Sequence, residues 1–404
     1  MSYNRLLNMV ILKAMKYRIY PTKAQAELLE KQFGCARFVY NRFLAVRKEY
    51  YLTHKDDPQK NGLNYYDTAA QLKELKKQPE YAWLKEAHSQ VLQQSLMNLD
   101  RAFQNFFAKR TKYPKFKRKH GVQSIRFPQY FFVLEKHISV PKIGKVKAKI
   151  HRPLEGKPKN LTITKTKSGR YFAAVQVEVE VPEPQPKASA VGVDLGLKSF
   201  LVTSDGQEIT PPKYLLKARK RLVRLQRHLS RCKKGSRGRE KARLALARQH
   251  EKVANQRGDF LHKASHRLTQ EFGLIGLEDL NVSGMVKNRK LAKAISDAGW
   301  GEFKRQLAYK ATWNGGFVVE VDRFFPSSKR CSACHYINPD MPLSIRFWDC
   351  PVCGAHHDRD FNAAVNILQE TLTRAGSAQS HAEGVSVSPI FGWAVHAELG
   401  SHPL

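Results

Sequence analysis

The sequence predicts a multidomain α+β protein, and three observations support this prediction. Residues 22–110 carry apolar side chains at helical spacing, residues 122–181 read as a series of strands, and strands alternate with helices from residue 190 onward. The chain has 404 residues, enough for two or three domains. Since 42% of its residues are hydrophobic, an intrinsically disordered chain is excluded.

The balance of charge indicates an anionic partner. The chain carries 70 Lys and Arg against 35 Asp and Glu, a formal net charge of +35. Such a protein repels itself unless an anion neutralises it. No stretch approaches the ~18–20 apolar residues of a membrane span, and the charge is spread over most of the chain rather than along amphipathic helices. We therefore expect nucleic acid as partner and no membrane.

The N-terminal segment, residues 1–20, has only a short apolar run that Lys13 and Lys16 interrupt, which is unlike a signal peptide. With six cysteines and no export signal, a reducing cytoplasm is the expected location. Residues 14–20 alternate like a strand that ends at Pro21. Thr22 and Gln25 then fit a capping box for a helix through about residue 52.

Two further helical patterns follow, over residues 64–78 and 88–110. Their apolar stripes are typical of helices that pack in a core, rather than of a binding surface. The next segment, Lys109–His120, contains eight Lys, Arg or His among twelve residues. It could be a solvated loop. We favour contact with nucleic acid, in which cations meet phosphates and rings stack on bases, by Lys112, Tyr113, Lys115, Lys117, Arg118 and Lys119.

The middle of the chain is predicted to be mostly strands, with a hairpin around Ser168-Gly169. Pro182–Ala188 has three prolines in seven residues, which suits neither helix nor sheet and indicates a linker. Lys213–Arg257 reads as a helical hairpin broken at residues 234–238, and it holds 17 Lys and Arg against two acids. From Ala375 onward the chain has no Lys or Arg, and we expect a mobile, dispensable tail.

The order of elements after the linker predicts an RNase H-like fold. Three short strands lie within residues 190–209, and then come the helical hairpin, a strand at 272–280, a helix at 297–313, a strand at 316–324 and a last helix from 358. Three strands, helix, strand, helix, strand, helix is the topology of that fold. In such a sheet the first and fourth strands are neighbours.

Three carboxylates fall at matching places on these elements. Asp194 ends the strand AVGVD, Glu278 ends the strand LIGLE, and Asp360 lies at the start of the last helix. Neighbouring strands would bring the first two together, and the helix would bring the third. Clustered carboxylates attract divalent cations, and hard oxygen ligands select Mg²⁺ or Mn²⁺. Two such ions ~3.5–4 Å apart can activate a water and stabilise the leaving oxygen of a phosphodiester.

Each acid also has an ordinary interpretation. Asp194 could be a turn residue, Glu278 could be a surface residue, and an aspartate at a helix start is often an N-cap. We assign the cap to Asp358 and the metal-ligand role to Asp360. The combination of three acids on the expected elements in the expected order is more specific than any one of them.

Four of the six cysteines form two pairs, Cys331/Cys334 and Cys350/Cys353, with 15 residues between the pairs. This spacing is typical of a zinc ribbon, whose four thiolates close the coordination shell, so that the zinc is structural. Disulfides or a redox pair are the alternatives, and two such pairs in one cytoplasmic chain argue against them. Cys35 and Cys232 are interpreted as ordinary thiols.

The stretches VGVDLGLKSF, IGLEDL, FPSSKRCSAC and CPVCGAHHDRDFNAAVNI, together with YRIYPTKAQ, FGCARFVYN and YPKFKRK, resemble the TnpB proteins of insertion sequences, which are related to type V CRISPR effectors. The resemblance spans roughly residues 15–372. It implies that Asp194, Glu278 and Asp360 are RuvC-type catalytic acids and that the four cysteines bind zinc. It also implies that Ser89, Gln90 and Gln93 face the DNA motif beside the target.

By this resemblance the chain is a metal-dependent DNA endonuclease, with a guide RNA and double-stranded target DNA as partners and one protein chain per RNA. The resemblance implies a β-barrel-like wedge domain with an inserted helical recognition domain, and then a RuvC nuclease domain with an inserted zinc ribbon. The expected boundaries are wedge 1–21 and 116–186, recognition 22–115, nuclease 187–326 and 357–374, zinc ribbon 327–356, and tail 375–404.

One position departs from the family pattern, because His335 follows the first cysteine pair where relatives often have glycine. His335 could compete as a zinc ligand. Two other functions remain open. A DNA transposase would use the same three acids on the ends of its element, and a zinc-bearing RNA-binding regulator would not be an enzyme. Retention of all three acids argues against the regulator.

Overall fold

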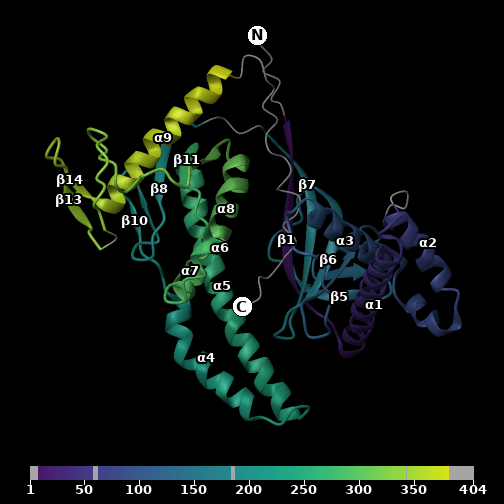
Figure 1. Cartoon of the computed structure of the whole chain (residues 1–404). Helices are drawn as coiled ribbons and strands as arrows, with labels where there is room; N and C mark the ends of the chain where they lie inside the picture. Colours follow the sequence, from purple (N-terminus) through teal and green to yellow (C-terminus); the bar gives the residue numbers. More distant parts are fainter. Residues whose placement is uncertain (1–7, 58–61, 183–186, 343, 382–404) are drawn as a thin grey trace. The chain divides into compact units, whose positions relative to one another are not determined.

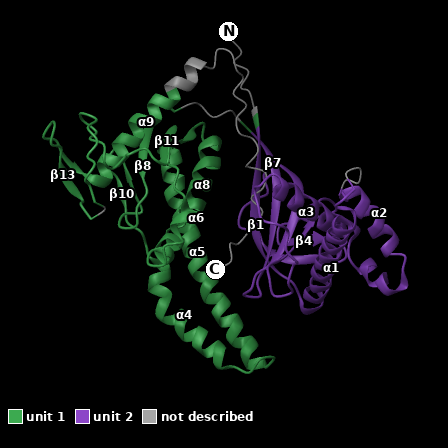
Figure 2. Ribbon diagram, in the orientation of Figure 1, with its two compact units in different colours: residues 1–9, 181–398 green, residues 10–180, 399–404 purple. Residues whose placement is uncertain are grey.

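The computed structural model describes residues 8–57, 62–182, 187–342 and 344–381 (Figure 1). These residues form two compact units (Figure 2). The first, called here the N-terminal unit, is Val10–Glu180. The second, the C-terminal unit, is built on the chain from Val181 onward. None of the helices in the described part of the chain is both long and apolar enough to span a membrane.

The N-terminal unit contains a seven-stranded sheet in the order β2-β6-β7-β1-β5-β4-β3. Its strands are β1 Asn8–Tyr20, β2 Gln123–Phe127, β3 Phe132–Val133, β4 His137–Val140, β5 Gly144–Lys149, β6 Lys157–Lys165 and β7 Tyr171–Pro182. The hairpin around Ser168-Gly169 joins β6 to β7, as expected. The order ends at β2 and β3, so the described strands form an open sheet and not a hydrogen-bonded barrel.

The helices of this unit come between β1 and β2 in sequence. The sheet therefore combines a strand that precedes the helices with six strands that follow them. They are α1 Lys23–His54, α2 Tyr65–Leu75, the 3₁₀ helix η1 Pro79–Glu86, and α3 Ser89–Phe107. The predicted capping box is confirmed, since Gln25 N donates to Thr22 Oγ1 at 3.3 Å and Thr22 N donates to Gln25 Oε1 at 3.1 Å. The sequence patterns did not predict η1.

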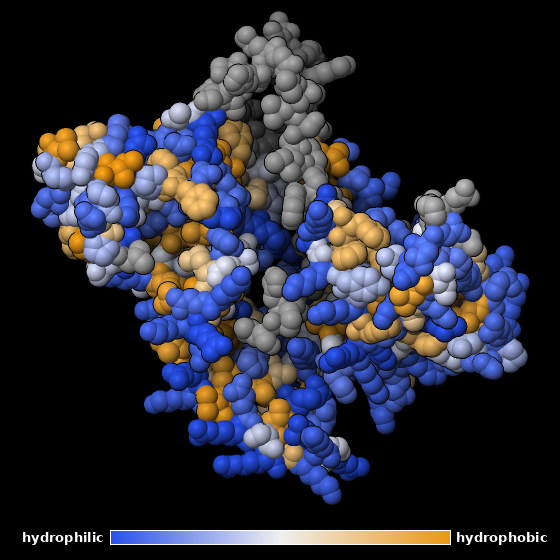
Figure 3. Space-filling model, in the orientation of Figure 1, coloured by the Kyte–Doolittle hydropathy of each residue, from blue (hydrophilic) through white to orange (hydrophobic). Residues whose placement is uncertain are grey.

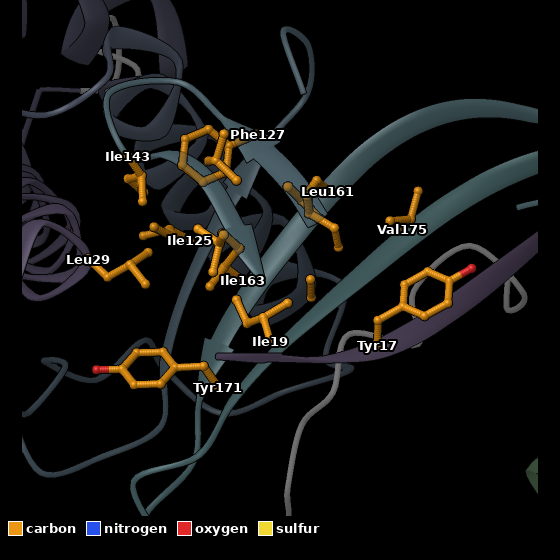
Figure 4. Packing of buried hydrophobic residues seen from close by; sticks show 14 of the residues in the cluster. Tyr17, Ile19, Leu29, Ile125, Phe127, Ile143, Leu161, Ile163, Tyr171 and Val175 are labelled. Atoms are coloured by element: carbon orange, nitrogen blue, oxygen red, sulfur yellow. The ribbon is translucent and has the colours of Figure 1, made fainter. Parts of the chain in front are cut away.

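Two cores stabilise this unit, and α1 contributes to both. One core joins the inner face of the sheet to Leu29 of α1 (Figure 4). Phe33 of α1 belongs to the same core. The other joins α1, α2, η1 and α3. Its buried residues include Val39, Phe43, Leu44, Leu84, Leu92, Leu96 and Leu99. The interpretation of the helical stripes as core is therefore confirmed for most of their residues, while Leu28 and Phe107 at the edges of the stripes are exposed.

The C-terminal unit contains a five-stranded sheet in the order β10-β9-β8-β11-β12. The strands are β8 Ala190–Asp194, β9 Leu201–Thr203, β10 Glu208–Ile209, β11 Leu274–Glu278 and β12 Phe317–Val321. Strands β8, β11 and β12 run parallel, while β9 pairs antiparallel with both of its neighbours, β8 and β10. Counted within this sheet the order is 3-2-1-4-5, so the first and fourth strands are neighbours as expected.

Helices α4 Tyr214–Arg231 and α5 Arg237–Glu271 form the predicted hairpin, whose drawn face is mostly hydrophilic (Figure 3). The remaining helices are α6 Val282–Met285, α7 Ala292–Ala298, α8 Trp300–Trp313 and α9 Arg359–His381. The helix expected at 297–313 is divided, because Gly299 has a φ of 72° and separates α7 from α8.

Helix α9 continues to His381, beyond the expected end at residue 374. One glycine within the added residues lowers helix propensity by about 1 kcal/mol relative to alanine, which does not end a helix by itself. The rest of the expected tail, 382–404, lies outside the described residues.

Helix α9 packs directly on the parallel strands, and two glycines make this possible. A Cβ at Gly192 of β8 would overlap the backbone of Ala364, and one at Gly276 of β11 would overlap Thr371. Glycine at both positions lets the helix approach the sheet closely. The part of α9 around Ala364 and Thr371 therefore lies against the strands that carry Asp194 and Glu278.

Candidate active site and metal centre

Asp194 and Glu278 lie side by side because their strands are paired. β8 and β11 are parallel, with Val193 opposite Leu277, so the next residue of each strand is at the same edge of the sheet. Both strands have buried side chains up to their last residue, and each acid is partly exposed beyond them. The apolar residues thus keep each strand in the core, and the carboxylate lies at the end of the strand, where the chain reaches the surface.

Asp360 approaches the same edge from α9. Asp358 Oδ1 accepts hydrogen bonds from the backbone N–H groups of Asp360 and Phe361, at 3.0 and 2.9 Å. Asp358 therefore caps the helix, as predicted. Because Asp358 satisfies the first N–H groups, the carboxylate of Asp360 is left for other partners.

The three acids influence one another electrostatically. Burial, together with the negative charges of Glu278 and Asp360, raises the pKa of Asp194 to about 8. Burial also raises the pKa of Glu278, although Ser327 Oγ donates a hydrogen bond to Glu278 Oε1 and opposes this. A carboxyl group with a raised pKa beside two other carboxylates is a site where a cation would be strongly favoured.

Arg346 is a cation that contacts Asp360 directly. Its Nη1 donates to both carboxylate oxygens of Asp360, at 3.0 and 3.3 Å. Arg346 lies within the cysteine-bearing region, between Cys334 and Cys350, and its carbonyl oxygen accepts from Arg359 N at 2.7 Å. The side chain and the backbone of Arg346 thus both connect that region to the start of α9.

The donor set fits divalent metal binding in its chemistry, since three carboxylates supply hard oxygen ligands. The carboxylate oxygens of these three acids are not arranged as a coordination shell in the structure. Within the described residues, the cysteine cluster alone brings three or more Cys, His, Asp or Glu ligand atoms within 4.8 Å of one another. The arrangement therefore identifies which residues would hold an ion, but not the geometry of the bound state.

The four cysteines form that cluster, since their Sγ atoms all lie within 4.8 Å of one another. Individual Sγ pairs are 3.7 Å apart for Cys331 and Cys353 and 3.5 Å apart for Cys334 and Cys350. No disulfide joins any of the six cysteines. Four thiols at these separations fit a tetrahedral zinc shell with no open position, which is structural rather than catalytic.

Two histidines lie beside the cysteines, and neither belongs to the cluster. His335 has a φ of 67°, and its backbone N donates to Cys331 O at 2.9 Å. Gly354 has the same geometry after the second cysteine pair, with a φ of 69° and a hydrogen bond from its N to Cys350 O at 2.8 Å. His335 therefore occupies the turn position that glycine usually takes. His357 Nε2 lies 3.0 Å from Cys331 Sγ.

The cysteine-bearing region ends in a short hairpin of β13 Phe347–Asp349 and β14 His356–Asp358, and β14 continues directly into α9. Two buried asparagines of α9 bind the backbone at the start of this region. Asn362 Nδ2 donates to Arg330 O at 2.7 Å, and Asn366 Nδ2 donates to Ser327 O at 2.8 Å. The region is thus fixed to the helix that carries Asp360.

The segment expected to contact nucleic acid lies in the N-terminal unit. Its predicted contact residues are all exposed: Lys112, Tyr113, Lys115, Lys117, Arg118 and Lys119. The ring of Tyr113 packs edge-on against Phe103 and Phe106, at centroid distances of 5.7 and 5.3 Å. Asn41 bonds both the N and the O of Lys117, at 2.8 and 2.9 Å, which anchors the segment to α1.

The three residues expected to face the flanking motif lie on the first turns of α3. Ser89 and Gln93 are exposed. Gln90 is partly buried, and its Nε2 donates to Gln129 Oε1 at 3.2 Å. The structure therefore leaves Ser89 and Gln93 accessible, while Gln90 has a partner within the chain.

Sequence patterns missed Ser327, Arg346 and His357. The first two touch the acids through segments that are distant in sequence, so no local pattern identifies them. His357 lies in HHDRD, directly before the capping aspartate, and its place in that run was the only signal.

Three family models match the chain. One described as "Probable transposase" (OrfB_IS605) covers residues 174–289, and a Cas12f1-like TNB domain covers residues 300–367. A third, described as a helix-turn-helix domain, covers residues 9–56. In the structure that last range is one strand and one long helix, β1 and α1.

Several known proteins are similar to this chain. A "Putative RNA-guided DNA endonuclease" of Streptomyces pristinaespiralis is 42% identical over 365 residues, covering 89% of each chain. The Escherichia coli K12 protein "Putative RNA-guided DNA endonuclease InsQ" is 36% identical over 375 residues, covering 88% of this chain and 92% of its own length. A Cas12f1–sgRNA–target DNA complex aligns with a TM-score of 0.49 and 12% identity, over 89% of this chain and 98% of that chain. The extent and identity of the first two matches show that this chain belongs to the TnpB family.

Proposed function

We propose that this chain is the RNA-guided endonuclease of an insertion sequence. It cleaves double-stranded DNA that matches its guide RNA beside a short flanking motif, by divalent-metal-dependent hydrolysis of phosphodiester bonds. The observation that carries the proposal is the convergence of Asp194, Glu278 and Asp360, which are 166 residues apart from first to last and meet at one edge of one sheet. The names of the two long relatives support the same activity.

We also propose that the C-terminal unit is a RuvC nuclease domain of the RNase H-like fold. The sheet order 3-2-1-4-5 with α9 packed on it supports this assignment. The sheet of the N-terminal unit would be the wedge, and helices α1 to α3 would be the recognition domain. The boundaries predicted from the sequence are retained for both, with the nuclease helix extended to His381.

In the proposed mechanism Asp194, Glu278 and Asp360 would hold Mg²⁺ or Mn²⁺. Bound there, the metal would supply an activated water and stabilise the charge on the leaving oxygen. On metal binding, Asp194 would release to solvent the proton that its raised pKa retains. Ser327 holds one oxygen of Glu278 by its hydrogen bond and so orients the other. Arg346, which now pairs with Asp360, places a permanent positive charge where a phosphate would enter.

Zinc would be held by Cys331, Cys334, Cys350 and Cys353, where it stabilises the fold of the ribbon. Through Arg346 and the asparagines of α9, the ribbon would position the first turn of that helix. We propose a structural role for this metal, distinct from the catalytic role of the ions at the carboxylates.

The partners would be one guide RNA per protein chain and a target DNA duplex. Base pairing would read the target, while the protein grips backbones and the flanking motif. The net charge of +35 and the 17 cations of residues 213–257 suit a long polyanion. Binding should therefore weaken steeply as salt rises, because each phosphate contact releases counterions.

A test is to express the chain with and without the DNA that flanks its gene, and to sequence the RNA that co-purifies. The expected result is one discrete RNA that ends in a variable guide. Replacing that guide should redirect cleavage to a matching duplex with the flanking motif, and Asp194→Ala should bind the same RNA without cutting. If the chain instead cuts or joins its element ends without RNA, the transposase alternative replaces this proposal.

A further inference from the structure

A pocket on the outer side of α1 is not explained by the active site or the zinc ribbon. It has a volume of about 560 Å³, within the range of small-ligand sites. Its lining comes from α1 and from η1 in the N-terminal unit. The lining residues are Gly34, Arg37, Phe38, Asn41, Arg42 and Trp83.

The chemistry of the lining is cationic and aromatic. Two of the six residues are arginines and none is acidic. Arg37 Nη1 donates to Gln123 Oε1 at 2.7 Å, which fixes its guanidinium at the pocket. Arg42 is exposed. A fixed and an exposed guanidinium in the lining of one pocket form a place for an anion such as phosphate.

Trp83 supplies the aromatic part. Its ring meets Phe38 edge-on, with centroids 5.0 Å apart and an interplanar angle of 68°. Phe38 is also in contact with Tyr81, at 5.7 Å, so the tryptophan is supported from within the fold. Trp83 nevertheless remains 39% exposed. A supported, partly open indole is a surface on which a base can stack.

Gly34 is an independent indication that something approaches α1 here. Glycine is a poor residue for the interior of a long helix, and Gly34 lies twelve positions inside one of 32 residues. Its φ is not positive, and a Cβ there would meet only the end of Arg37, at 4.0 Å. Packing within the described structure therefore does not require glycine at this position. Glycine is used where a ligand comes close to the backbone.

We propose that this pocket binds one unpaired nucleotide of the bound RNA, with the base on Trp83 and the phosphate between Arg37 and Arg42. The inference rests on the proposed function, because it needs an RNA partner. RNA is favoured over duplex DNA because unpaired bases occur in its loops and bulges, whereas bases of a duplex are stacked and paired. Asn41 also anchors the exposed basic segment 115–119 beside the pocket, which extends the cationic surface along the same strand.

The test uses the full chain and the RNA that co-purifies with it, sequenced and resynthesised with a fluorophore. Trp83→Ala should lower RNA affinity about tenfold, and Trp83→Phe, which keeps an aromatic ring, should stay within about twofold of wild type. Arg42→Ala should lower affinity about threefold and reduce the slope of log affinity against log salt by about 0.7. The matched controls are Tyr51→Ala and Lys48→Ala, an exposed ring and an exposed cation elsewhere on α1, which should change little.

Gly34→Ala separates binding from folding. Alanine should raise the melting temperature by about 2 °C, since it is the better helix former, and yet weaken RNA binding at least about threefold. A variant that merely misfolds would lose both. With 4-thiouridine in the RNA, photo-crosslinked peptides should contain residues 34–42 or Trp83.

The outcomes distinguish this inference from the proposed function. If wild type binds RNA and the three pocket variants bind it equally well, the pocket assignment is overturned and the proposed function stands. If these variants weaken binding of a blunt DNA duplex but not of RNA, the ligand is DNA and the assignment is again overturned. If wild type binds no RNA, both proposals fail together.

Discussion

The cysteine cluster and the carboxylate cluster belong to the same unit but are assembled differently. The four thiols already lie within 4.8 Å of one another, whereas the three acids do not form such a group. The thiols come from two tight turns 15 residues apart, and the second turn lies within the β13–β14 hairpin. The acids come from two strands and a helix, and their charges repel one another.

This difference indicates that local backbone geometry is sufficient for the structural metal site, while the proposed catalytic site depends on packing over the whole unit. Arg346 connects the two clusters, because it lies in the cysteine-bearing region and its side chain pairs with Asp360. Changes at the acids should therefore affect chemistry and leave the fold intact, and changes at the cysteines should affect the fold first.

The largest expected effect is at the acids. Asp194→Ala, Glu278→Gln and Asp360→Ala should each lower the cleavage rate at least about a thousandfold, because each removes a ligand of the ions that activate water. Binding of RNA and DNA should stay within about twofold, since the basic surface is untouched. Single-turnover cleavage with Mg²⁺ and a binding titration measure both. A variant that still cuts near the wild-type rate would show that its residue is not a metal ligand.

The second effect concerns the cysteine cluster. Cys331→Ser should reduce bound zinc from one ion per chain to near zero and lower the free energy of unfolding by about 4 kcal/mol. Cys232→Ser, at a cysteine outside the cluster, is the matched control and should retain zinc. Elemental analysis and chemical denaturation report the two quantities. A fully folded, zinc-free wild-type protein would contradict the assignment.

The third effect is the dependence of stability on pH without divalent ions. The folded pKa of Asp194 is about 8, against about 3.9 unfolded, so the folded state keeps a proton that the unfolded state releases between these values. Stability should fall as pH rises through this window. Asp194→Asn cannot ionise and should be more stable than wild type by about 2 kcal/mol at pH 8, and equal to it at pH 4. The full linkage is not expected, because the side chain is partly exposed.

Asp205 provides a control of opposite sign. Although burial opposes this, hydrogen bonds from Thr203 and Gln207 lower the pKa of Asp205. The stabilisation that ionised Asp205 gives the folded state is therefore present at neutral pH and lost on acidification. Asp205→Asn should thus destabilise the protein at pH 8. Denaturation curves of both variants at the two pH values decide the matter. Parallel behaviour of the two variants would refute the charge-repulsion argument.

The smallest effect concerns the turn at His335. A left-handed backbone is unfavourable for residues other than glycine, so His335→Gly should stabilise the ribbon by up to about 1 kcal/mol without loss of zinc. Gly354→Ala, at the equivalent turn, should destabilise it by a similar amount. Zinc-dependent melting compares the two. Loss of zinc from the histidine variant would instead make His335 a ligand.

Much of the fold followed from local patterns. The capping box at Thr22, the hairpin at Ser168-Gly169 and the break between α4 and α5 were all predicted correctly, because each depends on a few adjacent residues. The 3₁₀ helix η1 and the division between α7 and α8 were missed. Whether a short helix forms from Pro79, and whether Gly299 takes a positive φ, depends on neighbouring elements as much as on local propensity.

For the site, the sequence by itself determined which residues are proposed to carry the chemistry: three acids at the ends of buried strands and at a helix start, and four cysteines at zinc spacing. The tertiary structure alone decided their surroundings. Pairing of β8 with β11 and the close approach of α9 at Gly192 raise the pKa of Asp194, and folding brings Arg346 to Asp360. The physical reason is that strand and turn preferences act over a few residues, whereas burial and charge repulsion depend on atoms that only the folded chain brings together.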